Sequence, residues 1–96
     1  MLFVIVAIDR ENSLALRLAT RAAHFAYANE TGVIKLGGPF LDAGGDMIGS
    51  LIVIEAADLA QAREWQVNDP YAKAGLFASV DLRPWKATFN ACGANL

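Results

Sequence analysis

Short apolar runs and amphipathic segments alternate along this chain. The spacing of the hydrophobic residues differs between the two kinds of segment and marks the expected strands and helices. Leu2–Ile8 is an uninterrupted apolar run, rich in β-branched residues and followed at once by charged residues, which predicts a strand. Asn12-Ser13 can cap a helix that runs to about Thr31, because Gly32 follows as a typical helix stop.

The middle of the chain predicts two strands that form a hairpin. Val33–Leu36 is a short apolar segment that leads into Gly37-Gly38-Pro39, where we expect the chain to bend. Asp42–Asp46 contains two glycines and is a typical turn cluster. Met47–Glu55 then predicts a third strand, paired with the second across that turn.

The remaining part of the chain predicts a second helix and a fourth strand. Asp58 can cap a helix that runs to about Val67. Phe77–Leu82 predicts the fourth strand, and Pro84 is expected to end it or to place it at a sheet edge. The order of the elements is therefore β-α-β-β-α-β.

This order is typical of the ferredoxin-like fold, an α+β architecture. It has a four-stranded antiparallel sheet with both helices on one face. The chain has 96 residues and no linker or low-complexity segment. We therefore expect a single domain over residues 1–96.

The hydrophobic pattern also predicts what lies on the two faces of the sheet, because side chains alternate across a strand. The first and third strands are apolar on both sides: Leu2, Val4, Val6 and Ile8 oppose Phe3, Ile5 and Ala7, and Ile48, Ile52 and Ile54 oppose Leu51 and Val53. Two helices can cover only one face, and a solvated face should carry polar residues. We therefore expect a homodimer joined through the open sheet face, with higher oligomers left open.

The composition favours a partner chain over a membrane. Hydrophobic residues make up 55% of the chain, more than a small core can hide. The apolar run near the N-terminus is far shorter than the roughly 20 residues of a membrane span, and it lacks the features of a signal peptide. Cys92 is the only cysteine, so no internal disulfide can form, which fits a cytoplasmic protein.

Charge and residue counts argue against other classes of partner. The chain has 8 basic and 10 acidic residues and no basic run, so nucleic acid is not an expected partner. One histidine, one cysteine and no acidic cluster at ligand spacing predict no metal site. The glycine pairs do not stand in the strand–loop–helix order of a phosphate-binding loop. We expect no cofactor.

The first helix, drawn at about 100° per residue, has two apolar sides with a polar stripe between them. The sides are Leu14, Leu18, Ala22 and Phe25, and Leu16, Ala19, Ala23 and Tyr27; the stripe is Arg17, Thr20, Arg21 and His24. This pattern places His24, the only histidine, at the margin of the core. It is either a boundary histidine with one hydrogen bond or an acid–base group whose ring a second residue must orient.

Asp69 is the best candidate for that second residue. Asp69-Pro70 is a good start for a short helical turn that Gly75 would end. The carboxylate of Asp69 either only caps this turn or also reaches His24. In the second case it would fix the tautomer of the ring and make the other ring nitrogen a better proton acceptor.

Five short motifs, in order, resemble those of the YciI-like proteins from Leu2 to about Trp85. They are Arg21-x-x-His24-x-x-Tyr27, Gly37-Gly38-Pro39, Gly49-Ser50-Leu51, Asp69-Pro70-Tyr71-x-x-x-Gly75-Leu76-Phe77 and Arg83-Pro84-Trp85. The resemblance implies a ferredoxin-like fold of the dimeric α/β-barrel group, with His24 and Asp69 paired in a pocket. Members that resemble dehydrochlorinases and muconolactone isomerases suggest proton transfer on small organic acids. Residues 87–96 match no motif.

We therefore expect a cofactor-independent enzyme that uses His24 and Asp69 for elimination or isomerisation of a small, anionic organic molecule. The expected binding residues are Arg21 for a carboxylate, Gly38 for close backbone approach, and Tyr71 and Phe77 as pocket walls. The alternative is a non-catalytic ligand-binding or accessory dimer in which His24 and Asp69 form a structural bond. A cofactor-free monooxygenase or heme-handling protein of the same barrel group is a third hypothesis, although no residue specifically indicates it.

Overall fold

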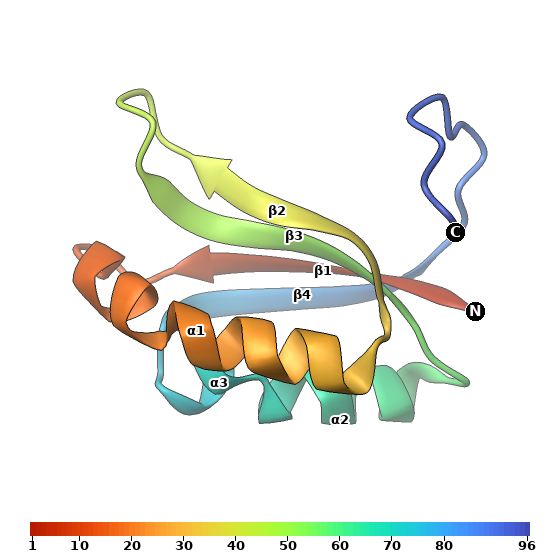
Figure 1. Ribbon diagram of the computed structural model, residues 1–96, viewed down its shortest axis with the longest axis horizontal. Coiled ribbons are helices and arrows are strands. Elements are labelled where there is room, and N and C mark those ends of the chain that lie inside the picture. Colours follow the sequence, from red (N-terminus) through yellow and green to blue (C-terminus); the bar gives the residue numbers. More distant parts are fainter.

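The chain forms a four-stranded antiparallel sheet with three helices on one of its faces, as a computed structural model of residues 1–96 shows (Figure 1). The strand order is β2-β3-β1-β4, which confirms the predicted ferredoxin-like fold. The elements are β1 (Leu2–Asp9), α1 (Leu14–Thr31), β2 (Ile34–Leu41), β3 (Met47–Glu55), α2 (Leu59–Asn68), α3 (Pro70–Lys73) and β4 (Phe77–Trp85).

Strand β2 differs from its prediction. The expected bend at Gly37-Gly38-Pro39 is wrong: the strand continues through these residues to Leu41 and stays paired with β3. Because β2 is an edge strand, Pro39 removes no hydrogen bond that the sheet needs. The irregularities lie instead between Ile34 and Leu36 and next to Phe40, where the register shifts. The glycine pair therefore forms part of the sheet edge.

Strand β3 passes unusually close to β1 at Gly49. A Cβ atom added there would lie 2.5 Å from the carbonyl oxygen of Ala7, so only glycine fits without displacing backbone. The next residue, Ser50, is paired with Ala7 and is buried on the helix side of the sheet. The close approach thus fixes the position of the Ser50 hydroxyl.

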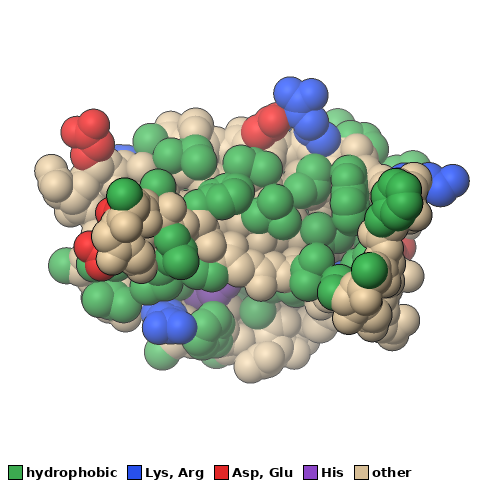
Figure 2. Space-filling view, turned by 90° about the horizontal axis from the view of Figure 1, so that it is seen from above, with side chains coloured by type: hydrophobic (Ala, Val, Ile, Leu, Met, Phe, Trp, Pro, Cys, Tyr) green, Lys and Arg blue, Asp and Glu red, His purple; other side chains and the backbone are tan.

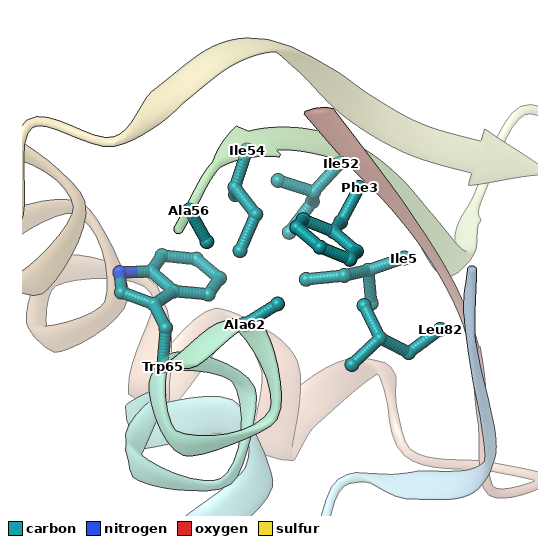
Figure 3. Close-up of a cluster of buried hydrophobic side chains, with 8 residues drawn as sticks. All are labelled: Phe3, Ile5, Ile52, Ile54, Ala56, Ala62, Trp65 and Leu82. Carbon is teal, nitrogen blue, oxygen red and sulfur yellow. The ribbon is translucent and has the colours of Figure 1, made fainter. Parts of the chain in front are cut away.

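The main hydrophobic core lies between the sheet and α2 (Figure 3). Ala62 and Trp65 project from α2 towards the helix-facing side chains of the strands. The cluster consists of Phe3, Ile5, Ile52, Ile54, Ala56, Ala62, Trp65 and Leu82. Each large side chain buried here stabilises the fold by roughly 1.5–3 kcal/mol relative to exposure. This core anchors α2, and with it the segment that carries Asp69.

Helix α1 packs differently from its prediction. Its buried side chains are Arg17, with 4% of its surface exposed, and His24, with 8%. Leu18 and Phe25, which belong to one of the two apolar sides, are about half exposed at 51% and 49%. Arg17 and His24 of the polar stripe therefore face inward, because α1 covers a cavity there, while Arg21 of the same stripe is exposed.

The helix-free face of the sheet is strongly apolar. Figure 2 views the molecule from this side and shows hydrophobic side chains over much of the surface. The strand register places Val4 and Val6 of β1 opposite Val53 and Leu51 of β3 on this face. The expectation that both faces carry apolar residues is therefore correct. None of the helices is both long enough and apolar enough to cross a membrane.

Candidate active site

A buried pair of side chains, His24 and Asp69, joins α1 to the segment between α2 and α3. The ring nitrogen Nδ1 of His24 lies 2.8 Å from Oδ1 of Asp69. Both residues are buried. Asp69 is held in place because it follows the last residue of α2 and caps α3, accepting a hydrogen bond from the backbone N–H of Tyr71 at 3.0 Å. Asp69 thus performs both of the roles considered for it, capping α3 and binding the imidazole.

This pairing defines which atom of His24 is free for chemistry. A carboxylate only accepts hydrogen bonds, so Nδ1 of His24 carries the proton and donates it to Asp69. The lone pair then lies on Nε2, which has no hydrogen-bond partner within the chain. His24 lines a cavity of about 280 Å³. The arrangement can accept a proton from a bound molecule and can stabilise the imidazolium that results.

Tyr71 fixes the plane of the imidazole. Its ring stacks on that of His24, with 4.2 Å between the ring centroids and 16° between the planes. The guanidinium of Arg17 lies 4.9 Å from the centroid of the Tyr71 ring. Phe77 packs edge-on against Tyr71 at 6.1 Å. Phe77 therefore supports the pocket from behind Tyr71, whereas Tyr71 lines it.

Arg17 and Ser50 belong to this site although neither was a candidate from the sequence. Nη1 of Arg17 donates to both carboxylate oxygens of Asp9, at 3.0 and 2.9 Å, and Nη2 donates to Oγ of Ser50 at 2.6 Å. Arg17 and Ser50 both line the cavity. Because Oγ of Ser50 accepts from Arg17, its own proton is free to be donated to a ligand. The available signals were the place of Arg17 in the polar stripe and the Gly49-Ser50 motif.

Among the charged side chains that line the cavity, only Arg21 has no carboxylate partner. Arg17 is neutralised by Asp9, and His24 is paired with Asp69. Arg21 is exposed at the rim, where its guanidinium lies 5.2 Å from the centroid of the Phe25 ring, and no carboxylate lies within ion-pair distance. Its charge therefore favours an anionic ligand.

The phenol of Tyr71 has a raised pKa. Burial of its side chain raises the pKa above the ordinary value of 10.0. The positive charges of Arg17 and Arg21 oppose this shift, while Asp69 and Asp9 add to it. Tyr71 therefore keeps its phenolic proton throughout the neutral pH range.

The sequence matches the model of the YCII-related domain over residues 1–86. The chain belongs to the YCII-related family. Protein YciI of Escherichia coli is 35% identical over 98 residues, covering 93% of this chain and all of that protein. An uncharacterised Haemophilus influenzae protein is 33% identical with the same coverage.

One solved structure resembles this YCII-related chain in both sequence and fold. It is the 5-chloro-2-hydroxyhydroquinone dehydrochlorinase of Burkholderia phenoliruptrix, in complex with 2,5-dihydroxybenzoquinone. The two chains are 41% identical with a TM-score of 0.84, and the match covers 90% of this chain and 94% of the other.

In this YCII-related chain the structure gathers most of the candidate residues around one cavity. His24, Arg21, Gly38 and Tyr71 line it; Asp69 lies behind His24, and Phe77 lies behind Tyr71. Gly38 contributes backbone only, from the edge strand β2. The four lining residues come from α1, β2 and α3, and Ser50 of β3 also lines the cavity, so the cavity exists only when these four elements are packed together.

Proposed function

We propose that this protein is a cofactor-independent enzyme in which His24, oriented by Asp69, transfers a proton during elimination or isomerisation of a small, anionic organic molecule. The observation that carries the proposal is the free Nε2 of His24 beside a cavity of about 280 Å³. The dehydrochlorinase at 41% identity supports this assignment, because loss of hydrogen chloride begins or ends with proton removal.

The proposed elimination uses His24 as the base. Nε2 takes a proton from a carbon of the substrate, and the electron pair of the broken C–H bond forms a new C=C bond. A leaving group on the neighbouring carbon departs with the electron pair of its own bond. The imidazolium then returns its proton to solvent. In an isomerisation, the same imidazolium would instead return the proton to a different carbon of the substrate.

The size and charge of the cavity support a single-ring substrate. An apolar cavity of about 150 Å³ can hold benzene, so about 280 Å³ leaves room for a substituted ring. Arg21 supplies an unpaired positive charge at the rim, and the hydroxyl of Ser50 supplies a donor inside. A hydroxylated, weakly acidic ring satisfies these groups together.

Replacing His24 with glutamine tests the proposal. We expect the rate of chloride release from 5-chloro-2-hydroxyhydroquinone to fall about 10²–10⁴-fold, because the amide cannot accept and hold a proton as imidazole does. Glutamine can still donate a hydrogen bond to Asp69, so the buried carboxylate keeps a partner. Steady-state kinetics of chloride release from this compound, and of turnover across a panel of other halogenated and non-halogenated hydroxylated rings, measures the loss.

Thermal unfolding and binding of 2,5-dihydroxybenzoquinone serve as controls for His24→Gln. Unfolding temperature and ligand affinity near those of the wild type, together with lost turnover, support catalysis. If the wild type binds the ligand but turns over nothing, and His24→Gln mainly destabilises the fold, the bond to Asp69 is structural. The protein would then be a ligand-binding domain.

We also propose that two copies associate through the helix-free sheet face, which would shield its apolar residues. Val6→Glu places a charge on this face and is expected to convert a dimer into a monomer in sedimentation analysis. Leu18→Glu is the matched control, because Leu18 is an exposed apolar residue of α1 on the opposite side of the molecule. A monomeric wild type, or an unchanged dimer in Val6→Glu, would contradict this interface.

A further inference from the structure

Of the three residues that define the Arg21-x-x-His24-x-x-Tyr27 motif, only Tyr27 does not line the cavity. It lies one turn after His24 on α1, and Trp65 lies one turn before Asp69 at the end of α2. The bond between His24 and Asp69 and the contact between Tyr27 and Trp65 are therefore neighbouring links between the same two segments. Two hydrogen bonds join α1 directly to α2, and both involve Trp65.

The hydroxyl of Tyr27 takes the place of a backbone donor where the chain leaves α2. It donates to the carbonyl oxygen of Trp65 at 2.9 Å. In a continued α-helix, that carbonyl would accept from the backbone N–H four residues later, which belongs to Asp69. Pro70 disfavours this continuation, because the residue before a proline avoids the helical conformation. The N–H of Asp69 donates instead to the carbonyl oxygen of Gln66 at 3.3 Å, and the backbone of Asp69 turns to φ −58° and ψ 130°. Tyr27 thus satisfies the carbonyl that this departure leaves free.

We propose that Tyr27 is a positioning residue for the pair of His24 and Asp69. Its hydroxyl holds the last turn of α2 at a fixed place against α1, so that the carboxylate of Asp69, which directly follows this turn, meets the imidazole. The inference rests on the proposed function, because it concerns the two residues that would transfer the proton. Tyr27 does not line the cavity, so it acts through Asp69 and not on the substrate.

The carboxylate of Asp69 can move little without losing a partner. Its Oδ1 accepts from Nδ1 of His24 at 2.8 Å and from the backbone N–H of Tyr71 at 3.0 Å. Without the Tyr27 hydroxyl, the Trp65 carbonyl is unpaired or must turn towards water, because an unpaired buried acceptor is unfavourable. The last turn of α2 then shifts, and Asp69 shifts with it. A displacement of about 1 Å at a catalytic group can lower a rate about 10²-fold.

The surroundings of Tyr27 suit a fixed donor. Its ring packs against the indole of Trp65 with 5.2 Å between the centroids, and Trp65 belongs to the main hydrophobic core. The hydrogen bond therefore ties α1 to a side chain that the core holds in place. Burial raises the pKa of Tyr27 above its ordinary value of 10.0, and the negative charges of Asp69 and Glu64 raise it further. The phenol thus keeps its proton throughout the neutral pH range and remains a donor to the carbonyl.

Tyr27→Phe removes the hydroxyl and keeps the ring against Trp65. We expect kcat to fall roughly 10–100-fold, because Asp69 no longer holds His24 in its place. KM should stay close to that of the wild type, because every residue that lines the cavity is unchanged. Chloride release from 5-chloro-2-hydroxyhydroquinone supplies both constants, and circular dichroism compares the folded state of the variant with that of the wild type.

Thr31→Val is the matched control. Oγ1 of Thr31 accepts from Nε1 of Trp65 at 2.9 Å and donates to the carbonyl oxygen of Tyr27 at 2.9 Å. The variant removes the other hydrogen bond between α1 and α2 but leaves the Tyr27 hydroxyl on the Trp65 carbonyl. It should lower the unfolding temperature about as much as Tyr27→Phe does and retain wild-type kcat. An equal loss of kcat in both variants would indicate a general loosening of the helices and would overturn the inference. Wild-type kcat in Tyr27→Phe, with His24→Gln inactive, would also overturn it and leave the proposed function standing.

A spectroscopic readout separates this inference from turnover itself. His24 is the only histidine, so an imidazole N–H signal in the proton NMR spectrum belongs to it. In the wild type and in Thr31→Val, the bond from Nδ1 to Asp69 should place this signal at low field and slow its exchange with water. In Tyr27→Phe the signal should move upfield and exchange faster. An unchanged signal in Tyr27→Phe would overturn the positioning role even if no substrate is turned over. A changed signal in a protein whose wild type turns over nothing would overturn the proposed function alone.

Discussion

Replacing Asp69 with alanine is expected to lower both the stability and the activity of the protein. Oδ1 of Asp69 accepts from His24 Nδ1 at 2.8 Å and from the Tyr71 N–H at 3.0 Å. The variant loses a helix cap, which costs about 0.5–2 kcal/mol, and leaves a buried N–H unpaired, which costs about 1–3 kcal/mol. We expect a loss of roughly 2–4 kcal/mol in the free energy of unfolding, measured by urea denaturation. Turnover should fall as well, because the ring of His24 is no longer oriented.

Asp69→Asn separates these two effects. Since His24 and the Tyr71 N–H bind the same carboxylate oxygen, an amide oxygen at that position can accept both bonds and preserve the cap and the tautomer. Only the negative charge is lost. Stability should return close to that of the wild type, while kcat stays about 10–100-fold low, because a charge-assisted bond to imidazolium is replaced by a weaker neutral one.

The two Asp69 variants also distinguish the functional classes. If Asp69→Asn restores stability and turnover together, the carboxylate is a structural cap and its charge has no part in catalysis. If asparagine restores stability alone, the charge acts on His24 in the reaction. The informative comparison is therefore between the change in kcat and the change in the free energy of unfolding, measured in both variants. Neither variant alone supplies it.

The order of the elements could be predicted because it depends on local signals. Charged residues end the first strand, Gly32 adopts the left-handed conformation that ends α1, and Asp58 caps α2 through the N–H of Gln61. The extent of β2 could not be predicted in this way. Glycine and proline usually break a strand, and only its edge position in the sheet makes Pro39 acceptable there.

The orientation of α1 in the fold could not be predicted from its hydrophobic pattern. Helical periodicity identifies which residues share a side but assumes that the apolar side faces inward. Here the inward side carries Arg17 and His24, because their partners come from distant segments: Asp9 from the end of β1, Ser50 from β3 and Asp69 from beyond α2. Spacing alone does not pair Arg17 with Asp9 or Ser50 in one sequence. The pairing of His24 with Asp69 beside a pocket could be expected, because the resemblance to the YciI-like proteins implies it.

The buried ion pair between Asp9 and Arg17 gives the largest expected loss of stability. Both side chains are 4% exposed, and Arg17 is held by no other carboxylate. Asp9→Ala therefore leaves a guanidinium charge buried without a counter-charge, which typically costs about 3–5 kcal/mol. For a small domain with a total stability of about 5–15 kcal/mol, this loss approaches unfolding. Urea denaturation at neutral pH measures it.

The exposed pair of Asp81 and Arg83 on β4 provides the matched control. Its carboxylate and guanidinium are 2.8 Å apart, as close as the buried pair, but both side chains face solvent. Asp81→Ala should change the free energy of unfolding by less than about 1 kcal/mol. A similar small loss in Asp9→Ala would contradict the view that burial makes the Arg17 charge dependent on Asp9.

A double variant, Asp9→Leu with Arg17→Met, then distinguishes stability from function. Replacing both members of a buried pair by apolar residues of similar size is often neutral, so most of the stability should return. The variant nevertheless removes the donor to Ser50 and the cation beside the Tyr71 ring. If the pair only supports the fold, turnover should recover with stability. If Arg17 positions Ser50 and Tyr71 for the substrate, the recovered protein should fold well and remain catalytically impaired, and we expect this second outcome.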